Sequence, residues 1–198
     1  MKKMALREQR EENILLSLRK LNYLTRSQLQ ALHRLGTARN ASRFMKRLQD
    51  QGFVSSFRDG ENVYYLNQEG RERVGATKVC KKTAQARHHI MRNSAFIAFG
   101  SPMSWKAEMK LEVPGEVRII ADALFLKDKR YHIVEVDHQQ KMSANRAKVK
   151  KYRRLMELSV FEQPPVFIWV TTTEFRRKQL LHICEGLDVQ VFTITDFH

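Results

Sequence analysis

The sequence predicts a mixed α+β protein built from two different domains. Residues 1–76 have mainly the apolar spacing of helices, with two short strands, whereas residues 84–198 alternate strands and helices. Residues 77–83 form a basic linker without either periodicity. The charge is also uneven: residues 1–83 carry 18 basic and 8 acidic residues, and the remainder carries 18 and 13. These three observations predict two domains with different tasks.

The composition points to an anionic partner. The 198 residues include 36 Lys and Arg against 21 Asp and Glu, a formal charge of +15. A compact fold with this charge repels itself unless it meets an anion, and nucleic acid is the usual one. No segment has the roughly 20 apolar residues of a membrane span, and the basic start lacks the apolar segment of a signal peptide. We therefore expect a cytoplasmic protein that binds double-stranded DNA and no membrane.

The cysteines do not indicate a metal site. Cys80 and Cys184 stand far apart, and no Cys or His spacing typical of zinc surrounds them. A disulfide is not expected in the cytosol. The sequence predicts no cofactor, unless acids of the second domain hold Mg²⁺.

Three helices are predicted at the start of the chain. Residues 11–21 place their apolar side chains on one helical face. Thr25 and Gln28 have the spacing of a capping box, so a second helix begins there, and Gly36 ends it. The third helix covers residues 37–51, up to a glycine that stops it.

A hairpin and a short helix complete the first domain. Residues 53–57 and 63–66 are predicted to be strands. The Asp-Gly pair between them is a strong signal for a hairpin turn. Residues 67–74 then form a short helix. Helix, capped helix, basic helix and hairpin follow one another in the order of a winged helix-turn-helix.

The third helix is the predicted recognition helix. It gathers Ala41, Phe44 and Leu48 on an apolar side, which can dock on the domain, and polar residues without an acid on the other side, which can enter the major groove. Near the hairpin tip, a further basic side chain can lie on the phosphate backbone. The expected DNA contacts of this domain are Arg39, Asn40, Ser42, Arg43, Lys46 and Arg58.

A plain structural interpretation stands beside this one. The same domain could serve protein contact, with the basic residues as an ordinary solvated face. Asp50 lies near that face one turn later, where it would repel phosphate.

The second domain has the predicted element order αβββαβαβ. A helix over residues 84–99 precedes three strands, which turn at a Pro-Gly pair and at Lys127–Arg130. A long helix, an apolar buried strand, a further helix and a last strand complete the order. The predicted strands cover residues 105–112, 117–126, 131–137, 166–171 and 188–194, and the later helices cover residues 141–159 and 174–185.

Two acids stand in otherwise apolar strands of this domain. If the turn is centred between Asp128 and Lys129, then Asp122 and Glu135 lie directly opposite each other, with Cβ atoms about 4.5–5.5 Å apart. Two carboxylates so placed cannot both ionise cheaply without a cation beside them. Asp137 shares the face of Glu135. Asp122 and Glu135 could hold Mg²⁺, which prefers oxygen ligands.

The element order and the acids resemble the restriction-endonuclease-like fold of PD-(D/E)XK nucleases. Where that family has its lysine, this sequence has Asp137, and Ala121 replaces the preceding proline. The resemblance implies catalysis by Asp122, Glu135 and Asp137, with a lysine that has migrated to Lys148 on the long helix. The alternative is an inert core, in which Lys148 or Lys151 only neutralises the acids.

Nearly the whole chain is similar to the replication-relaxation family of plasmids and mobile elements of Gram-positive bacteria. The resemblance implies a DNA-binding accessory of plasmid replication or DNA relaxation. The matching residues are Leu24-Thr25, Gln28-Leu29, Arg43, Leu48, Gly52-Phe53-Val54, Val63–Leu66, Gly70, Ala121–Leu124, Val134–Asp137, Lys148, Tyr152 and Val166–Val170.

The long helix offers a second basic surface. Seven Lys or Arg and no acid lie between Lys141 and Arg154, whereas an ordinary solvated face usually carries both signs. Arg146, Lys150 and Arg153 share its outer face, and we expect them to contact DNA.

Three functions remain open from the sequence. The first is a two-domain DNA-binding regulator without catalysis, working as a homodimer because winged-helix proteins often read paired half-sites. The second is a Mg²⁺-dependent nuclease or nickase. The third is a scaffold that recruits a replication or transfer enzyme.

Overall fold

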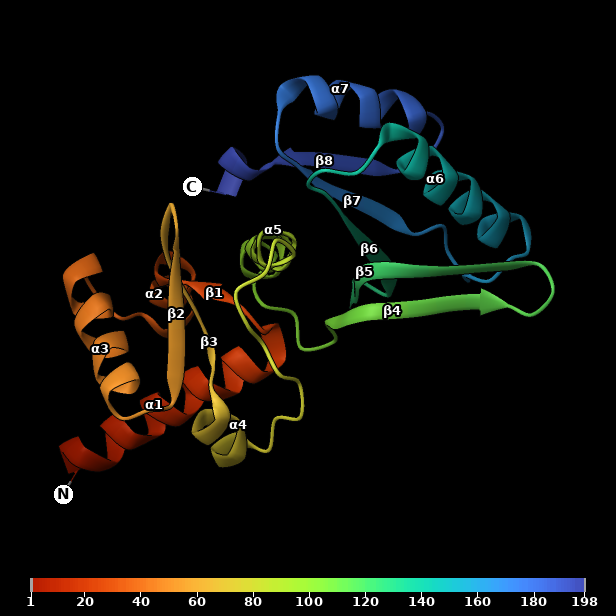
Figure 1. The fold of residues 1–198 in the computed structure, drawn as a ribbon. Helices are drawn as coiled ribbons and strands as arrows, with labels where there is room; N and C mark the ends of the chain where they lie inside the picture. Colours follow the sequence, from red (N-terminus) through yellow and green to blue (C-terminus); the bar gives the residue numbers. More distant parts are fainter. Residues whose placement is uncertain (1, 198) are drawn as a thin grey trace. The chain divides into compact units, whose positions relative to one another are not determined.

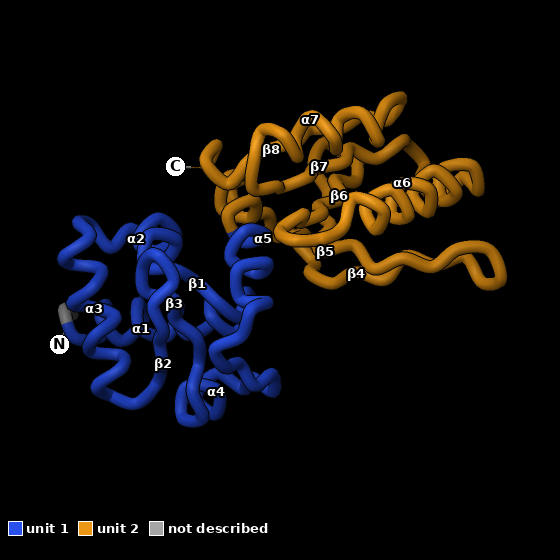
Figure 2. Tube along the Cα trace, turned by 45° about the horizontal axis from the view of Figure 1, so that its top comes forward, with its two compact units in different colours: residues 1–93 blue, residues 94–198 orange. Residues whose placement is uncertain are grey.

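The computed structural model describes residues 2–197 as a mixed α+β fold with seven α-helices and two β-sheets (Figure 1). The chain divides into two compact units, residues 1–93 and 94–198 (Figure 2). The division falls within helix α5 (Ala86–Ala98). The domain bounds predicted from the sequence remain a prediction. None of the helices in the described range is long and apolar enough to cross a membrane.

The first unit contains the predicted order of helices and strands. Its elements are α1 (Lys2–Leu21), β1 (Leu24–Thr25), α2 (Arg26–His33), α3 (Ala38–Asp50), β2 (Val54–Asp59), β3 (Glu61–Leu66) and α4 (Gln68–Val74). β1, β3 and β2 form a small antiparallel sheet in that order. The two-residue strand β1 was not predicted, because so short a segment carries no periodicity.

The capping box that opens α2 is confirmed. The backbone N–H of Gln28 donates to Thr25 Oγ1 at 3.2 Å, and the N–H of Thr25 donates to Gln28 Oε1 at 3.1 Å. The predicted helix end is wrong: α2 ends at His33, and Arg34 takes the left-handed conformation with φ of 48°. The predicted start of α1 at residue 11 is also wrong, since the helix begins nine residues earlier, at Lys2. Its first turns are exposed, so they carry no apolar periodicity.

The packing of α3 follows the prediction with one correction. Ala41, Met45 and Leu48 are fully buried, whereas Phe44, predicted for the apolar side, is only half-buried. Thr37 caps the helix by accepting from the N–H of Asn40. In both views α3 and α4 lie on opposite sides of the β2–β3 hairpin (Figures 1 and 2).

The second unit has the predicted element order, beginning in α5. The order is β4 (Lys106–Val113), β5 (Val117–Lys127), β6 (Arg130–Asp137), α6 (Met142–Glu157), β7 (Val166–Thr171), α7 (Glu174–Ile183), β8 (Val189–Thr193) and a short 3-10 helix (Ile194–Phe197). The five strands form one sheet in the order β4-β5-β6-β7-β8. The first three are antiparallel, and β6, β7 and β8 are parallel.

The two faces of this sheet are covered differently. α6 and α7 lie side by side over one face (Figure 1). The buried side chains there include Val149, Tyr152 and Leu155 of α6 and Leu180 of α7. On the other face Phe125 stacks on Trp105 and His132. Glu135 and Asp137 of β6 lie on the face of the sheet that these two helices cover.

The turn between β5 and β6 confirms the predicted register. Asp128 and Lys129 have φ of 51° and 60°, as a two-residue hairpin turn requires. The ladder runs from Lys127 opposite Arg130 to Ala123 opposite Val134, which is the predicted offset, and it ends there. Asp122 is the next residue, and it uses its side chain instead: Oδ2 accepts from the N–H of Val136 at 2.7 Å.

Candidate nucleic-acid interface and acidic centre

The predicted DNA-contacting residues of α3 all lie on its exposed side. These exposed residues are Arg39, Asn40, Ser42, Arg43 and Lys46. The buried side chains of the same helix face the rest of the unit, so the polar face is turned to solvent by packing. A helix with this division can dock through one face and reach a nucleic acid through the other.

One cation of this face already has a partner. Lys46 Nζ lies 2.5 Å from Asp50 Oδ1, one turn along the helix. Both side chains are largely exposed, so this pair adds little stability. Asp50, which the sequence placed near this face, therefore neutralises the charge of Lys46 in this arrangement. Arg47 is not among the predicted DNA contacts. Its Cζ atom lies 4.8 Å from the centre of the Phe44 ring.

The β2–β3 hairpin holds Arg58 at an exposed position near its tip at Gly60. Glu61, beside the tip of the hairpin, ties it to the start of α2, because it accepts from the N–H of Ser27 at 3.0 Å and pairs with Arg26 at 3.3 Å. Asp59 pairs with Arg87 of α5 through two contacts. Arg58 is therefore presented from a hairpin whose neighbouring side chains are tied to the unit.

The acids and lysine predicted in the second unit come together. Lys148 of α6 reaches down to Glu135 Oε2, and its Nζ lies 3.8 Å from Asp122 Oδ2. The Tyr152 hydroxyl, one turn further along α6, donates to Glu135 Oε1. The Glu135 side chain is 1% exposed, and those of Asp122 and Lys148 are 15% and 22% exposed. These four residues form what we call the acidic centre.

The electrostatics of Glu135 follow from its surroundings. Burial raises the pKa of Glu135 well above its ordinary value, and the negative charge of Asp122 raises it further, while Lys148 works in the opposite sense. Burial and the neighbouring carboxylate also raise the pKa of Tyr152, so its hydroxyl remains a donor at neutral pH. The centre is therefore built to hold one proton or one ammonium between two acids.

The acidic centre in this arrangement does not fit Mg²⁺. Both oxygens of Glu135 accept from protein donors, one from Lys148 and one from Tyr152. The ammonium of Lys148 occupies the position beside the two acids that a cation would take. Within residues 2–197 no group of three or more His, Cys, Asp or Glu side chains could hold a metal ion.

Asp137, which the nuclease resemblance placed in the catalytic set, belongs to a separate network. Arg176 of α7 binds its two oxygens through two contacts of 2.6 Å. Asn145 and Thr171 each donate to it at 2.8 Å. These donors lower the pKa of Asp137 against the effect of its burial, first among them the guanidinium of Arg176. The predicted neutralisation by Lys151 is not seen, because Lys151 is exposed and Arg176 takes its place.

A groove runs between β5 and α6 and reaches Lys148. Its volume is about 540 Å³, and Ala144 and Ala147 keep it open on the α6 side. Arg118 and Lys151 are its further cations, and no acid is among its lining residues. No sequence pattern indicates this groove, because its two walls come from segments whose relative position depends on the fold.

The outer face of α6 differs from the prediction in one residue. Arg146 and Lys150 are exposed as expected. Arg153 instead turns to the end of α7, where it donates to the carbonyls of Ile183 at 3.4 Å and Glu185 at 2.7 Å. A cation in this position satisfies carbonyls that the helix end leaves without partners.

The fold resembles two solved structures, both at 11% identity. A protein from Vibrio cholerae, VC1899, matches with a TM-score of 0.43 over 94% of this chain and 47% of its own. Can2 from Sulfobacillus thermosulfidooxidans, solved in complex with cyclic tetra-adenylate, matches with a TM-score of 0.39 over 94% of this chain and 51% of its own. The chain thus spans about half the length of each. No curated protein matches it.

The fold and the sites define a mixed α+β protein with an exposed basic helix in one unit and a buried acid–lysine centre in the other. The family model for replication-relaxation proteins matches residues 15–168, so the chain belongs to the replication-relaxation family. The predicted family is confirmed. Membership suggests a role in the replication or relaxation of a plasmid or mobile element.

Proposed function

We propose that the chain is a DNA-binding accessory or regulatory protein of a plasmid or mobile element, and that its first unit is a winged helix-turn-helix. The observation that carries this proposal is the division of α3 into a buried apolar side and an exposed side with three cations, Arg39, Arg43 and Lys46. Arg58 on the hairpin adds a backbone contact. The second unit is then a nuclease-like domain without catalysis.

The test is a fluorescence-anisotropy titration of duplex DNA selected from a random pool. Replacing Arg39 or Arg43 by Ala should cost about 1–3 kcal/mol each and relax the preference at one base. The matched control is the double change of Lys127 and Lys129 to Ala, which removes two exposed charges from the turn of the second unit. Specific binding that survives the Arg39→Ala/Arg43→Ala change would overturn the assignment of α3.

The salt dependence tests the proposed homodimer as well. Two copies of these contacts neutralise roughly 6–10 phosphates, so the affinity should fall about 10³–10⁵-fold between 50 and 200 mM salt. Light scattering of the complex gives the stoichiometry directly. One protein chain on each specific DNA site, with half the expected dependence of affinity on salt, would contradict the dimer. It would not contradict the proposed DNA contacts of each chain.

A second candidate function is a Mg²⁺-dependent nuclease or nickase. The observation that favours it is the convergence of Asp122 and Glu135 on Lys148, which also lines a groove together with Arg118 and Lys151. Against it stands the engagement of both Glu135 oxygens, since Lys148 would have to leave before a cation could enter. Phosphodiester hydrolysis also needs an activated water and charge stabilisation.

A plasmid-nicking assay with Mg²⁺ or EDTA separates the two candidates. The regulatory proposal expects no cleavage by the wild-type protein in either condition. Mg²⁺-dependent cleavage that is lost in Asp122→Asn, Glu135→Gln and Lys148→Ala, but kept in the exposed control Lys150→Ala, would establish the nuclease instead.

A further inference from the structure

The groove between β5 and α6 has an exposed cation on each of its two walls. Arg118 comes from β5 and Lys151 from α6. Within the described part of the chain, neither side chain makes a hydrogen bond or an ion pair. Glu112 stands opposite Arg118 in the β4–β5 ladder, but Lys110 of the same strand forms the ion pair with it. The two cations of the groove are therefore available to an anionic ligand.

Apolar side chains line the groove between these cations. Ile120 of β5 is 51% exposed, and Ala144 and Ala147 of α6 belong to the other wall. The volume of about 540 Å³ lies within the range of about 300–1,000 Å³ that is usual for ligand sites. The groove thus combines positive charge with an apolar surface that is open to solvent.

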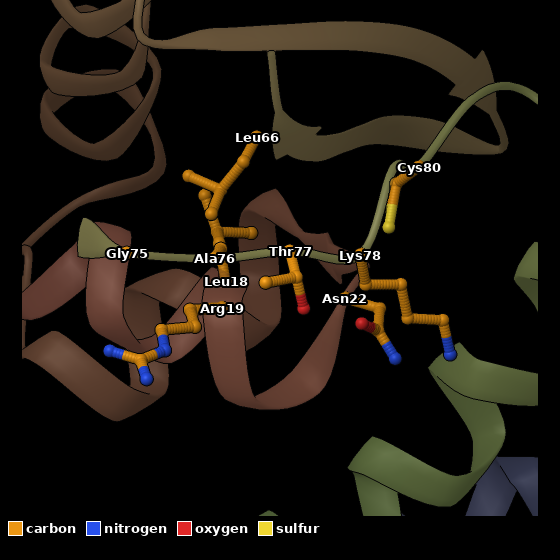
Figure 3. Close-up of a pocket in the computed structure, with 9 residues that line it drawn as sticks. All are labelled: Leu18, Arg19, Asn22, Leu66, Gly75, Ala76, Thr77, Lys78 and Cys80. Carbon is orange, nitrogen blue, oxygen red and sulfur yellow. The ribbon is translucent and has the colours of Figure 1, made fainter. Parts of the chain in front are cut away.

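The pocket of the first unit does not have this combination. It has a volume of about 260 Å³ and lies between the end of α1 and the segment after α4 (Figure 3). Arg19 there donates to the carbonyl of Val74 at 2.6 Å, and Lys78 also interacts with another residue. The head groups of these two cations lie on opposite sides of the pocket (Figure 3). The groove of the second unit is therefore the better candidate for an anionic ligand.

We propose that the groove binds an unpaired strand of DNA, an inference that rests on the proposed function because that function makes DNA the ligand. The phosphates of the strand pair with Arg118 and Lys151, and its bases lie against Ile120 and the two alanines. A duplex keeps its base faces stacked inside, so it can use the two cations and not the apolar surface. An unpaired strand exposes both its phosphates and its base faces, and it matches both parts of the groove.

The acidic centre borders the same groove through Lys148. This side chain lines the groove and neutralises Glu135, and its Nζ lies 3.8 Å from Asp122 Oδ2. The ammonium thereby shields a bound strand from the two acids. One chain then holds duplex DNA through α3 and an unpaired strand through the second unit.

The test is a fluorescence-anisotropy titration of labelled oligo(dT) with the full chain, with the selected duplex, oligo(rU) and dTMP as competitors. Oligo(dT) should bind saturably, and unlabelled oligo(dT) should displace it at lower concentration than any other competitor. Displacement by dTMP at equal concentration would assign the groove to a free nucleotide, and tighter binding of oligo(rU) would assign it to RNA. Either result overturns the proposal.

Two variants of the groove separate its charge from its shape. Arg118→Gln/Lys151→Gln should lower the affinity for oligo(dT) about tenfold or more and reduce its salt slope by about 1.4, since each phosphate contact in a single strand contributes about 0.7. Ala147→Leu fills the groove and leaves the charge unchanged, and leucine keeps the helix. It should lower the affinity for oligo(dT) and not that for the duplex.

The control is Lys127→Gln/Lys129→Gln, which removes the same charge from the exposed turn of this unit and should leave oligo(dT) binding unchanged. Oligo(dT) affinity that is unchanged in both folded groove variants would overturn the proposal, as would an equal loss of duplex affinity in Ala147→Leu. Arg39→Ala/Arg43→Ala should remove specific duplex binding and keep oligo(dT) binding. A failure of the first unit to bind duplex is thus distinguished from a failure of the groove.

Discussion

Two buried acids on strand β6 have pKa values that are shifted in opposite directions. Glu135 and Asp137 stand two residues apart on β6, and both are almost completely buried. Arg176, Asn145 and Thr171 give Asp137 a full set of donors, and its pKa is lowered. Glu135 has one ammonium, one hydroxyl and a second carboxylate nearby, and its pKa is raised. Donor number and geometry, and not burial alone, therefore decide whether a buried acid stays ionised.

Breaking the Asp137 network should have the largest effect. Arg176→Met leaves a buried carboxylate without its charge partner, so the free energy of unfolding should fall by about 3–5 kcal/mol. Urea unfolding measures this, with the exposed Lys178→Met on the same helix as control. A loss below about 1 kcal/mol would show that Asn145 and Thr171 hold Asp137 without the arginine.

Breaking the Glu135 pair should cost less. Lys148→Met should lower the free energy of unfolding by about 1–3 kcal/mol at neutral pH, because Glu135 can take up a proton in place of the ammonium. The loss should shrink at pH 5. Lys150→Met is the exposed control on α6. If Lys148→Met destabilises as strongly as Arg176→Met at both pH values, the two acids are equally ionised and the comparison fails.

The pH dependence should have opposite signs at the two acids. The pKa of Glu135 is raised in the folded state, so this carboxyl stabilises the fold at pH values below 4.5, the ordinary pKa of glutamate. This contribution is lost as the pH rises through the pKa of the folded state. Glu135→Gln should therefore gain stability relative to the wild type with rising pH. The lowered pKa of Asp137 stabilises the fold above 3.8, and this contribution is lost as the pH falls through the folded pKa.

The corresponding variant of Asp137 serves as the internal control. Asp137→Asn should be least stable relative to the wild type at neutral pH, and the difference should shrink in acid. Urea unfolding of both variants between pH 3 and pH 8 measures the two slopes. Slopes of the same sign would refute the contrast between the two acids.

Removing the neighbouring acid should have the smallest effect. Asp122→Asn deletes the charge that raises the pKa of Glu135, while an amide oxygen can still accept from the N–H of Val136. The free energy of unfolding should change by less than about 1 kcal/mol, in the stabilising direction, and DNA affinity should stay constant. The control is Asp128→Asn in the exposed turn. A loss of DNA affinity in Asp122→Asn alone would place this acid in a binding role.

Local signals in the sequence predicted most of the elements and part of the site. The Thr25–Gln28 capping box and the Asp128–Lys129 turn depend on residues close in the chain, and both are confirmed. The turn also determined the offset of β5 and β6, and the helical spacing of Lys148 brought it to Glu135. Interactions within one element, across one turn or between a strand and the helix that follows it can be predicted from residue spacing.

The remaining partners depend on packing between distant elements. Arg176 reaches Asp137 from a helix 39 residues later, and nothing in the spacing distinguishes it from Arg177 beside it. Arg153 has the helical position of a surface cation, yet its guanidinium donates to the Glu185 carbonyl just after α7. The ladder also ends one pair before Asp122, where a side chain replaces the backbone as acceptor. These choices are made by the arrangement of α6 and α7 on the sheet, which no local pattern encodes.

Helix α5 has a consequence for anyone who expresses part of this chain. Its first half is fastened to the first unit: Asn93 donates to the carbonyls of Leu21 at 3.0 Å and Tyr23 at 2.7 Å, and Gln28 donates to that of Ile90 at 2.9 Å. A fragment cut at residue 83 would lose these donors and acceptors and leave the carbonyl ends of α1 bare. Fragments of the first unit should therefore run through Asn93, and a screen of end points would find its soluble products beyond that residue.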